Sequence, residues 1–270
     1  MSLFGKPPWN WVAVGVVLMQ CVWVANSEPT NAQSDAEIQG HALAQKILAQ
    51  RPAENGANTG VLSIKAANGQ LTKLPIKCEI TCSPEGWQNI YEFVRTNGSP
   101  TGERYPSREK YIIRHAANQT NSYSHEVYTG GIFENQEQLH VGGGVASLAG
   151  DELMTPIAGS DFWVADLGLE FFHWPQQKVL KKEFHRQCAC MVLESSRPYA
   201  SKGYSRVVCW IDEDSLGIVE AFAYDLDGKK LKNFYPKNLE KVNGQYQVES
   251  MVMENLQTGS NSRLDFDWNK

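Results

Sequence analysis

Two hydrophobic periods divide the chain after its first thirty residues. Between residues 34 and 50 apolar side chains recur every three to four positions, at Ile38, Ala42, Leu43, Ile47 and Leu48. This spacing predicts one amphipathic helix. Ser34 is suited to its N-cap, and Glu37 three residues later completes a capping box, while Pro52 stops the helix. We expect this helix to cover an open edge or end of a sheet.

From residue 59 onward the period changes to two. Ile76, Cys78, Ile80 and Cys82 alternate with polar residues, which predicts a strand with one apolar face. Further extended runs cover residues 88–96, 110–116, 122–128, 187–194, 205–212, 218–225, 245–254 and 262–268. Between such runs stand turn pairs that tolerate a positive φ angle, namely Asn68-Gly69, Asn97-Gly98, Asp227-Gly228 and Asn243-Gly244. Many strands joined by hairpins predict a mainly β protein with one large antiparallel sheet, curled or barrel-like.

The segment 160–174 breaks this pattern, because it has no period of two and is dense in aromatic residues. We predict short helical turns, with Ser160 as the cap, that pack their apolar side chains against the concave face of the sheet. These side chains are the candidate ligand-binding residues: Phe162, Trp163, Leu167, Phe171, Phe172 and Trp174. The alternative, that they only complete the core, stays open.

The N-terminus has the pattern of a cleaved secretory signal peptide at residues 1–27. Lys6 precedes an apolar run at 11–25 that is shorter than the roughly 20 residues needed to span a bilayer. Cleavage is expected after Ser27, or as late as Ala32. A lipoprotein cleavage site at Cys21 is disfavoured, because large residues precede it and the apolar run continues beyond it. The remaining residues 34–270 are expected to form a single exported domain.

Composition narrows the partners and the redox chemistry. The formal net charge is −5, so no nucleic-acid partner is expected. Five cysteines follow the signal, and they stand inside predicted strands rather than at turns, so we expect buried apolar side chains or cross-strand disulfides instead of a metal site. A hairpin that closes symmetrically about the loop 196–202 would place Cys190 opposite Cys209, within disulfide reach.

Catalytic motifs are missing from the sequence. It contains neither the G-x-S-x-G pattern of serine hydrolases nor the H-E-x-x-H pattern of zinc proteases. His140 precedes three glycines that are weakly similar to an oxyanion loop, but no nucleophile motif accompanies them. Residues 225–229 begin like a calcium loop but lack the downstream glutamate, so a type I′ hairpin turn is the preferred interpretation. We expect neither an enzyme nor a cofactor.

One stretch carries a resemblance to a known family. Gly159, Ser160, Asp161 and Phe162, followed by Asp166 and Leu167, resemble the G-S-D-F-x-x-x-D-L signature of the LolA-like outer-membrane lipoprotein-sorting proteins. The order of later segments is similar too. Residues 207–212 resemble the family's W-v-D strand, and 223–232 resemble its Y-D-x-x-G-k-x-x-K hairpin. The match covers residues 155–268.

This resemblance implies an unclosed antiparallel β-barrel whose concave apolar face is covered by short helices. It implies a periplasmic carrier or chaperone that binds the acyl chains of lipoproteins or lipids during outer-membrane lipoprotein sorting, with envelope membrane proteins as further partners. A ligand-sensing regulatory or structural envelope protein on the same fold is the alternative. The chain departs from the family at Trp163 and Val164 and in its five cysteines, which leaves the particular ligand open.

Overall fold

The computed structural model describes residues 33–98, 104–117, 119–129, 143–242 and 245–267. Residues 33–270 form one compact unit. The predicted signal peptide, Asn243-Gly244 and His140 lie outside the described residues, so those predictions remain predictions.

Thirteen strands form one antiparallel sheet. In chain order they are β1 Gly56–Lys65, β2 Leu71–Cys82, β3 Gly86–Gly98, β4 Arg104–Ala116, β5 Ser122–Thr129, β6 Gly143–Leu148, β7 Gln176–His185, β8 Cys188–Ser196, β9 Arg206–Asp212, β10 Ile218–Tyr224, β11 Lys230–Val242, β12 Gln245–Asn255 and β13 Asn261–Asp267. Strands adjacent in sequence pair as neighbours, except that β6 and β7 do not pair and β1 pairs with β13. The predicted mainly β architecture is confirmed.

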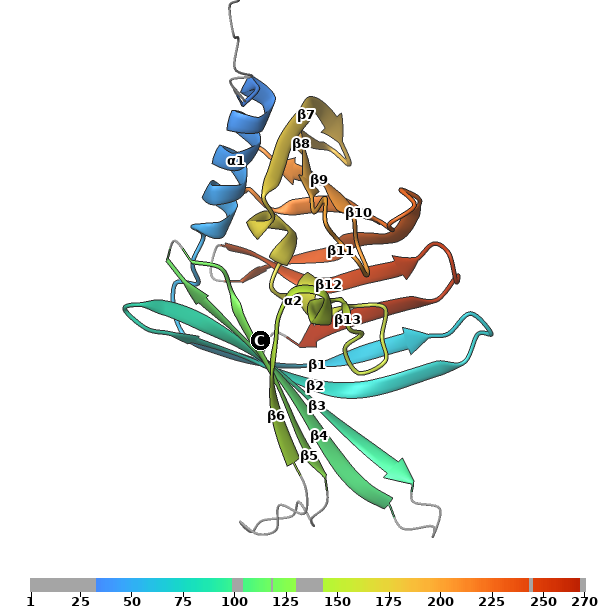
Figure 1. The fold of residues 1–270 in the computed structure, drawn as a ribbon. Coiled ribbons are helices and arrows are strands. Elements are labelled where there is room, and N and C mark those ends of the chain that lie inside the picture. Colours follow the sequence, from blue (N-terminus) through green and yellow to red (C-terminus); the bar gives the residue numbers. More distant parts are fainter. Residues whose placement is uncertain (1–32, 99–103, 118, 130–142, 243–244, 268–270) are drawn as a thin grey trace, which may run out of the picture. The chain divides into compact units, whose positions relative to one another are not determined.

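The pairing of β1 with β13 places both edges of the sheet in the middle of the chain. The edges are β6 and β7, which follow each other in sequence but lie at opposite ends of the strand order. The sheet therefore curls without closing, as an unclosed barrel does (Figure 1). One connection, from β6 to β7, has to cross the gap between the two edges.

This connection, residues 149–175, is called the cover segment below. It contains the short helices η1 Gly150–Met154, α2 Val164–Leu167 and η2 Glu170–His173, which lie inside the curve of the sheet (Figure 1). The predicted helical turns are confirmed, but the prediction of Ser160 as their cap is wrong. Helix α2 is capped at Trp163, whose backbone N–H donates to the Asp166 carboxylate at 2.7 Å. The Ser160 hydroxyl instead accepts the backbone N–H of Phe162.

Helix α1, Asp35–Leu48, begins with the predicted capping box, in which Ser34 and Glu37 bond each other's backbone N–H. It packs along the edge strand β7, as expected for a helix that covers an open edge. Gly40 lies so close to the β7 backbone at Gln177 that a β-carbon would overlap it. The face with Gly40, Leu43, Ala44 and Ile47 is therefore the buried one, and Ile38 and Ala42 of the predicted stripe are exposed.

The predicted turns at Asn68-Gly69 and Asp227-Gly228 are present, but the predicted type I′ geometry is not. Gly69 and Gly228 have positive φ, but Asn68 and Asp227 do not. A type I′ turn needs positive φ at both central positions, so this interpretation of Asp227-Gly228 is wrong. Asn97-Gly98 forms the end of β3 and is paired with β4. Both central residues have positive φ between β7 and β8, where Arg186 and Gln187 make the two-residue turn.

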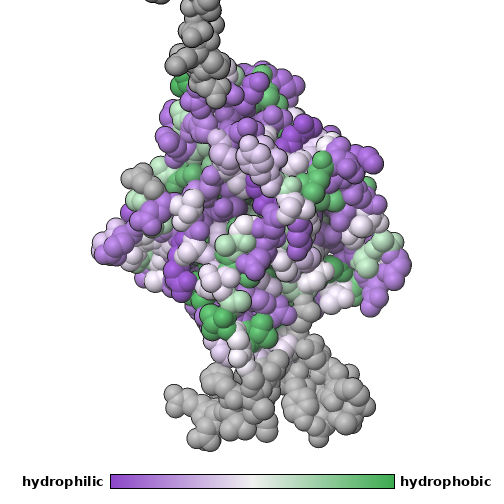
Figure 2. Space-filling view, viewed as in Figure 1, coloured by the Kyte–Doolittle hydropathy of each residue, from purple (hydrophilic) through white to green (hydrophobic). Residues whose placement is uncertain are grey.

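The outer surface and the interior differ in character. On the face drawn in Figure 2, hydrophobic residues form separate small patches among hydrophilic ones. The large continuous cluster of apolar side chains is internal and joins the cover segment to both halves of the sheet. Within the described part of the chain, no helix combines the length and the apolar character needed to cross a bilayer.

Candidate functional site

The concave face of the sheet is the surface against which the cover segment packs. Alternate residues of each strand face it, as shown by the buried pairs Ile76–Phe93 and Leu62–Leu264 on neighbouring strands. The predicted apolar face of β2 is this one, since Ile76 and Cys78 both pack into the internal cluster. The concave face is therefore the surface on which a ligand would meet apolar side chains.

The candidate ligand-binding residues lie where the sequence suggested, between the cover segment and the sheet. Four are buried and two are half-buried; the buried ones are Phe162, Phe171, Phe172 and Trp174, and the others are Trp163 and Leu167. Phe171 meets Phe172 and Trp174 edge-on, with ring centroids 4.6 Å and 6.3 Å apart. These rings pack into the internal apolar cluster.

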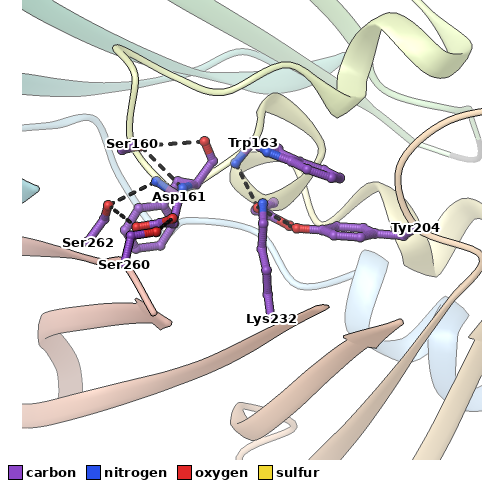
Figure 3. Close-up of polar contacts among 9 residues, drawn as sticks. Ser160, Asp161, Trp163, Tyr204, Lys232, Ser260 and Ser262 are labelled. Carbon is purple, nitrogen blue, oxygen red and sulfur yellow. Dashed lines mark hydrogen bonds and ion pairs between the residues drawn. The ribbon is translucent and has the colours of Figure 1, made fainter. Parts of the chain in front are cut away.

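Asp161 makes the first polar anchor of the cover segment. Its carboxylate accepts hydrogen bonds from the hydroxyls of Ser260 at 2.6 Å and Ser262 at 2.8 Å, on the β12–β13 turn and on β13. Its backbone N–H donates to the Ser262 oxygen at 2.9 Å. Figure 3 shows the three residues facing one another. This buried carboxylate is held by neutral hydroxyl groups.

Asp166 makes the second anchor, and its partners include a cation. Besides capping Trp163, its carboxylate accepts the hydroxyl of Tyr204 at 3.1 Å. The ammonium of Lys232, on β11, lies 3.9 Å from Asp166 Oδ2. Tyr204 and Lys232 are both almost completely buried. The second anchor is therefore a buried ion pair with one additional hydroxyl.

Aromatic rings enclose this ion pair. Trp163 stacks on Tyr204 with ring centroids 4.4 Å apart and planes inclined by 18°. Lys232 Nζ lies 3.4 Å from the centroid of the Trp163 ring, a cation–π geometry. Burial raises the pKa of Asp166 and lowers the pKa of Lys232 to about 7, although the attraction between the two opposes both shifts. Burial therefore disfavours the charged form of both partners.

Two further contacts fix the ends of the cover segment. Arg197, after β8, donates to Asp151 at 2.7 Å, and its guanidinium lies over the Trp174 ring. Tyr123, on β5, donates its hydroxyl to Glu170 at 2.8 Å. The cover segment is thus bonded to both halves of the sheet.

A small cavity of about 20 Å³ lies beside the second anchor. Apart from Asp166, Tyr204 and Lys232 its lining is apolar and comprises Leu169, Phe171, Val207, Ala221, Ala223, Phe234 and Met253. Of the six candidate residues, Phe171 alone is among its lining residues. A space of this size holds about one water molecule, so no acyl chain fits here while the cover segment is in place.

A larger pocket of about 290 Å³ lies on the concave face outside the cover segment. Strands β1, β2, β3, β12 and β13 form it, and the side chains that line it include Asn58, Cys78, Ile80, Asn89, Tyr91 and Phe266. No residue of the cover segment is among its lining residues. This volume is close to the lower end of small-molecule sites, which is about 300 Å³.

The predicted disulfide between Cys190 and Cys209 is wrong. In the β8–β9 pair Cys209 lies opposite Leu193, whereas Cys190 lies opposite Asp212, so the two thiols point to opposite faces of the sheet. All five described cysteines are free, and burial raises the pKa of Cys190 to about 11. Among the described residues no cluster of three or more metal-ligating side chains occurs.

Lys232 and Tyr204 were not among the residues predicted for the site. Lys232 stands in the 223–232 hairpin on which the resemblance partly rests, but a lysine on a hairpin is expected to be solvent-exposed. Tyr204 stands at the end of a polar loop. The only sequence signal for it was an aromatic residue among polar neighbours.

The sequence was compared with family models and with curated proteins. A family model described only as "Uncharacterized protein" matches residues 143–268. No curated protein matches the chain.

Three solved structures have similar folds. A DUF1329 family protein from Desulfovibrio piger is 20% identical, with a TM-score of 0.64 over 87% of this chain and 92% of its own. A putative outer membrane lipoprotein-sorting protein domain from Vibrio parahaemolyticus is 18% identical, with a TM-score of 0.65 over 86% and 92%. A LolA superfamily protein from Nitrosomonas europaea is 15% identical, with a TM-score of 0.52 over 87% and 93%. The resemblance found in the sequence is thereby confirmed at the level of fold.

Proposed function

We propose that this chain is an exported, periplasmic carrier that binds the acyl chains of lipoproteins or lipids on the concave face of its sheet. The observation that carries this proposal is the pocket of about 290 Å³ on that face, which the cover segment leaves unfilled. The sorting role named for the similar Vibrio domain supports the same ligand class.

The energetics favour an acyl chain. Each buried CH₂ group contributes about 0.8 kcal/mol, so a chain gains affinity along its length without any specific polar contact. Cys78, Ile80 and Phe266 offer such an apolar wall, and Asn58 and Asn89 add polar groups that could orient one end of a ligand. Binding and releasing an acyl chain makes and breaks no covalent bond, so a carrier function accounts for this site without catalysis.

The cover segment supplies the second part of the proposal. Its aromatic residues pack into the internal apolar cluster, against which Cys78 and Tyr91 of the pocket wall pack too. A displacement of the cover segment would join the pocket to the space that these aromatic residues fill. We assign Phe162, Trp163, Leu167, Phe171, Phe172 and Trp174 to the wall that a longer acyl chain contacts after this displacement.

The test is direct binding of a fluorescent fatty acid, together with mass spectrometry of lipid extracted from the purified protein. Ile80→Phe adds bulk inside the pocket, and we expect it to weaken fatty-acid binding by about tenfold, or ~1.4 kcal/mol. Thr81→Phe is the matched control, because Thr81 is exposed on the opposite face of the same strand. The proposal is wrong if the wild-type protein binds no acyl ligand, or if both variants bind as the wild type does.

A further inference from the structure

Among the described residues, Lys232 is the only lysine or arginine that is buried. Its side chain is 1% exposed, and its ammonium has no hydrogen-bond partner there. An ammonium carries three donors, and leaving them unpaired away from water is costly. The Asp166 carboxylate lies 3.9 Å from the ammonium, beyond hydrogen-bonding distance.

The partners of Lys232 come from two different parts of the protein. Lys232 belongs to the sheet, while Trp163 and Asp166 belong to the cover segment. Tyr204 lies in the loop between β8 and β9, and its ring centroid is 5.1 Å from the Lys232 ammonium. Displacing the cover segment would therefore remove both the carboxylate and the Trp163 ring, while Lys232 would stay on the concave face.

The surroundings that remain would be almost entirely apolar. The cavity beside Lys232 is otherwise lined on the sheet side by side chains such as Val207, Ala221 and Met253. A neutral chain that entered here would cover an unpaired ammonium. An anion that entered would replace the carboxylate and could approach to hydrogen-bonding distance, which Asp166 does not do.

We propose that Lys232 binds the anionic head of the amphiphile that this protein carries, a carboxylate or a phosphate, in exchange for Asp166. This inference rests on the proposed function and makes it more specific: the ligand is an anionic lipid, and its head enters at β11. The charge of Asp161 also acts on Lys232, but the Asp161 carboxylate is hydrogen-bonded to Ser260 and Ser262 and is not the group that the ligand replaces.

The test compares matched oleoyl ligands by displacement of the uncharged dye N-phenyl-1-naphthylamine. Oleate supplies a carboxylate and oleoyl lysophosphatidate a phosphate, while methyl oleate and mono-oleoylglycerol have the same chain and no charge. We expect the wild type to bind at least one anionic ligand about tenfold more tightly than the neutral ones, since a hydrogen bond to a charged group has this magnitude. The stronger of the two anions identifies the head group.

Lys232→Met removes the charge and keeps the length of the side chain, and it should abolish this preference. Because it leaves Asp166 without its cation, the double variant Lys232→Met/Asp166→Asn is measured too, which leaves neither charge. Lys230→Met is the control: Lys230 is exposed and lies over the Phe222 ring, and this variant should keep the preference.

Each outcome decides the inference. A preference for anions that disappears in both Lys232 variants and persists in the control supports it. Equal binding of anionic and neutral ligands by the wild type, or a preference that survives in a folded Lys232 variant, overturns it while the proposed carrier function stands. If none of the four ligands displaces the dye, the carrier function is wrong and the inference falls with it.

Discussion

Asp161 and Asp166 lie in the same short stretch of the cover segment, yet they are held by different chemistry. Asp161 accepts two serine hydroxyls at 2.6 Å and 2.8 Å. Asp166 accepts a tyrosine hydroxyl at 3.1 Å and faces a buried ammonium at 3.9 Å. Both contacts tie the cover segment to the sheet. Only the Asp166 contact depends on an ion pair, and burial disfavours the charged form of both of its partners.

The difference suggests a division of roles. Short hydrogen bonds to a carboxylate are strong and directional, so the Asp161 anchor should hold its end of the cover segment in place. A buried ion pair without a direct hydrogen bond gives little net stabilisation, because desolvation offsets the attraction. The Asp166 anchor should therefore separate at lower cost, which is what exchange for a ligand anion requires.

The largest expected effects come from the aromatic side chains beside each anchor. Phe162→Ala and Phe171→Ala should each lower the free energy of unfolding by about 3–5 kcal/mol, because both rings are buried. Phe171 borders the small cavity next to Lys232, whereas Phe162 does not. Urea denaturation gives the stabilities, and fatty-acid binding is then measured on the folded fraction. We expect both variants to weaken binding, and Phe171→Ala to weaken it more because Phe171 borders the cavity. Wild-type affinity in both variants would mean that these rings only complete the core.

The next effect concerns the Asp161 anchor itself. Asp161→Ala removes two charge-assisted hydrogen bonds and should lower the free energy of unfolding by about 3 kcal/mol. Asp225→Ala is the comparison, because the Asp225 carboxylate also accepts two hydrogen bonds but lies in an exposed turn. It should cost far less. Similar losses in urea denaturation for the two variants would remove the basis for a rigid first anchor.

The sequence predicted the parts of this molecule that depend on local pattern. The period of two and the turn residues identified most strands, and Ser34 with Glu37 marked the start of α1. The family signature identified Asp161 and Asp166, but it did not indicate what each one bonds. Their partners, Ser260, Ser262 and Lys232, are far away in sequence, and no local pattern specifies such contacts.

Register was the main source of error. The disulfide prediction assumed that the β8–β9 hairpin is symmetric about residues 196–202, whereas Ser196 pairs with Arg206. A shift by an odd number of residues sends a side chain to the other face of the sheet, so Cys190 and Cys209 separate completely. The predicted stripe of α1 was right at Leu43 and Ile47 but wrong at Ile38 and Ala42. A contact with a distant strand, at Gly40, sets the rotation of the helix.

A smaller effect should appear in the pH dependence of stability. The pKa of Lys232 is lowered to about 7 in the folded protein and is close to 10.5 when unfolded. Between these values the unfolded chain binds more protons, so the free energy of unfolding should rise with pH, by roughly 2 kcal/mol from about pH 7 to pH 9. Lys232→Met should lack this rise when both proteins are unfolded in urea at each pH. Parallel profiles for the two proteins would show that Lys232 titrates as an ordinary lysine.

The smallest effect isolates the hydroxyl that the second anchor uses. Tyr204→Phe keeps the ring stacked on Trp163 but removes one donor to the Asp166 carboxylate, and it should cost about 1–2 kcal/mol in urea denaturation. Tyr235→Phe is a matched control, since Tyr235 also donates its hydroxyl to a carboxylate, Glu254, at 3.0 Å but in a half-buried position. It should change stability by no more than about 0.5 kcal/mol.

The loss of the Tyr204 hydroxyl also makes Asp166 depend more on Lys232. Tyr204→Phe combined with Lys232→Met should therefore lower the free energy of unfolding by more than the sum of the single changes. Additive costs would mean that the hydroxyl and the ammonium act on Asp166 independently, and the second anchor would then be two separate contacts.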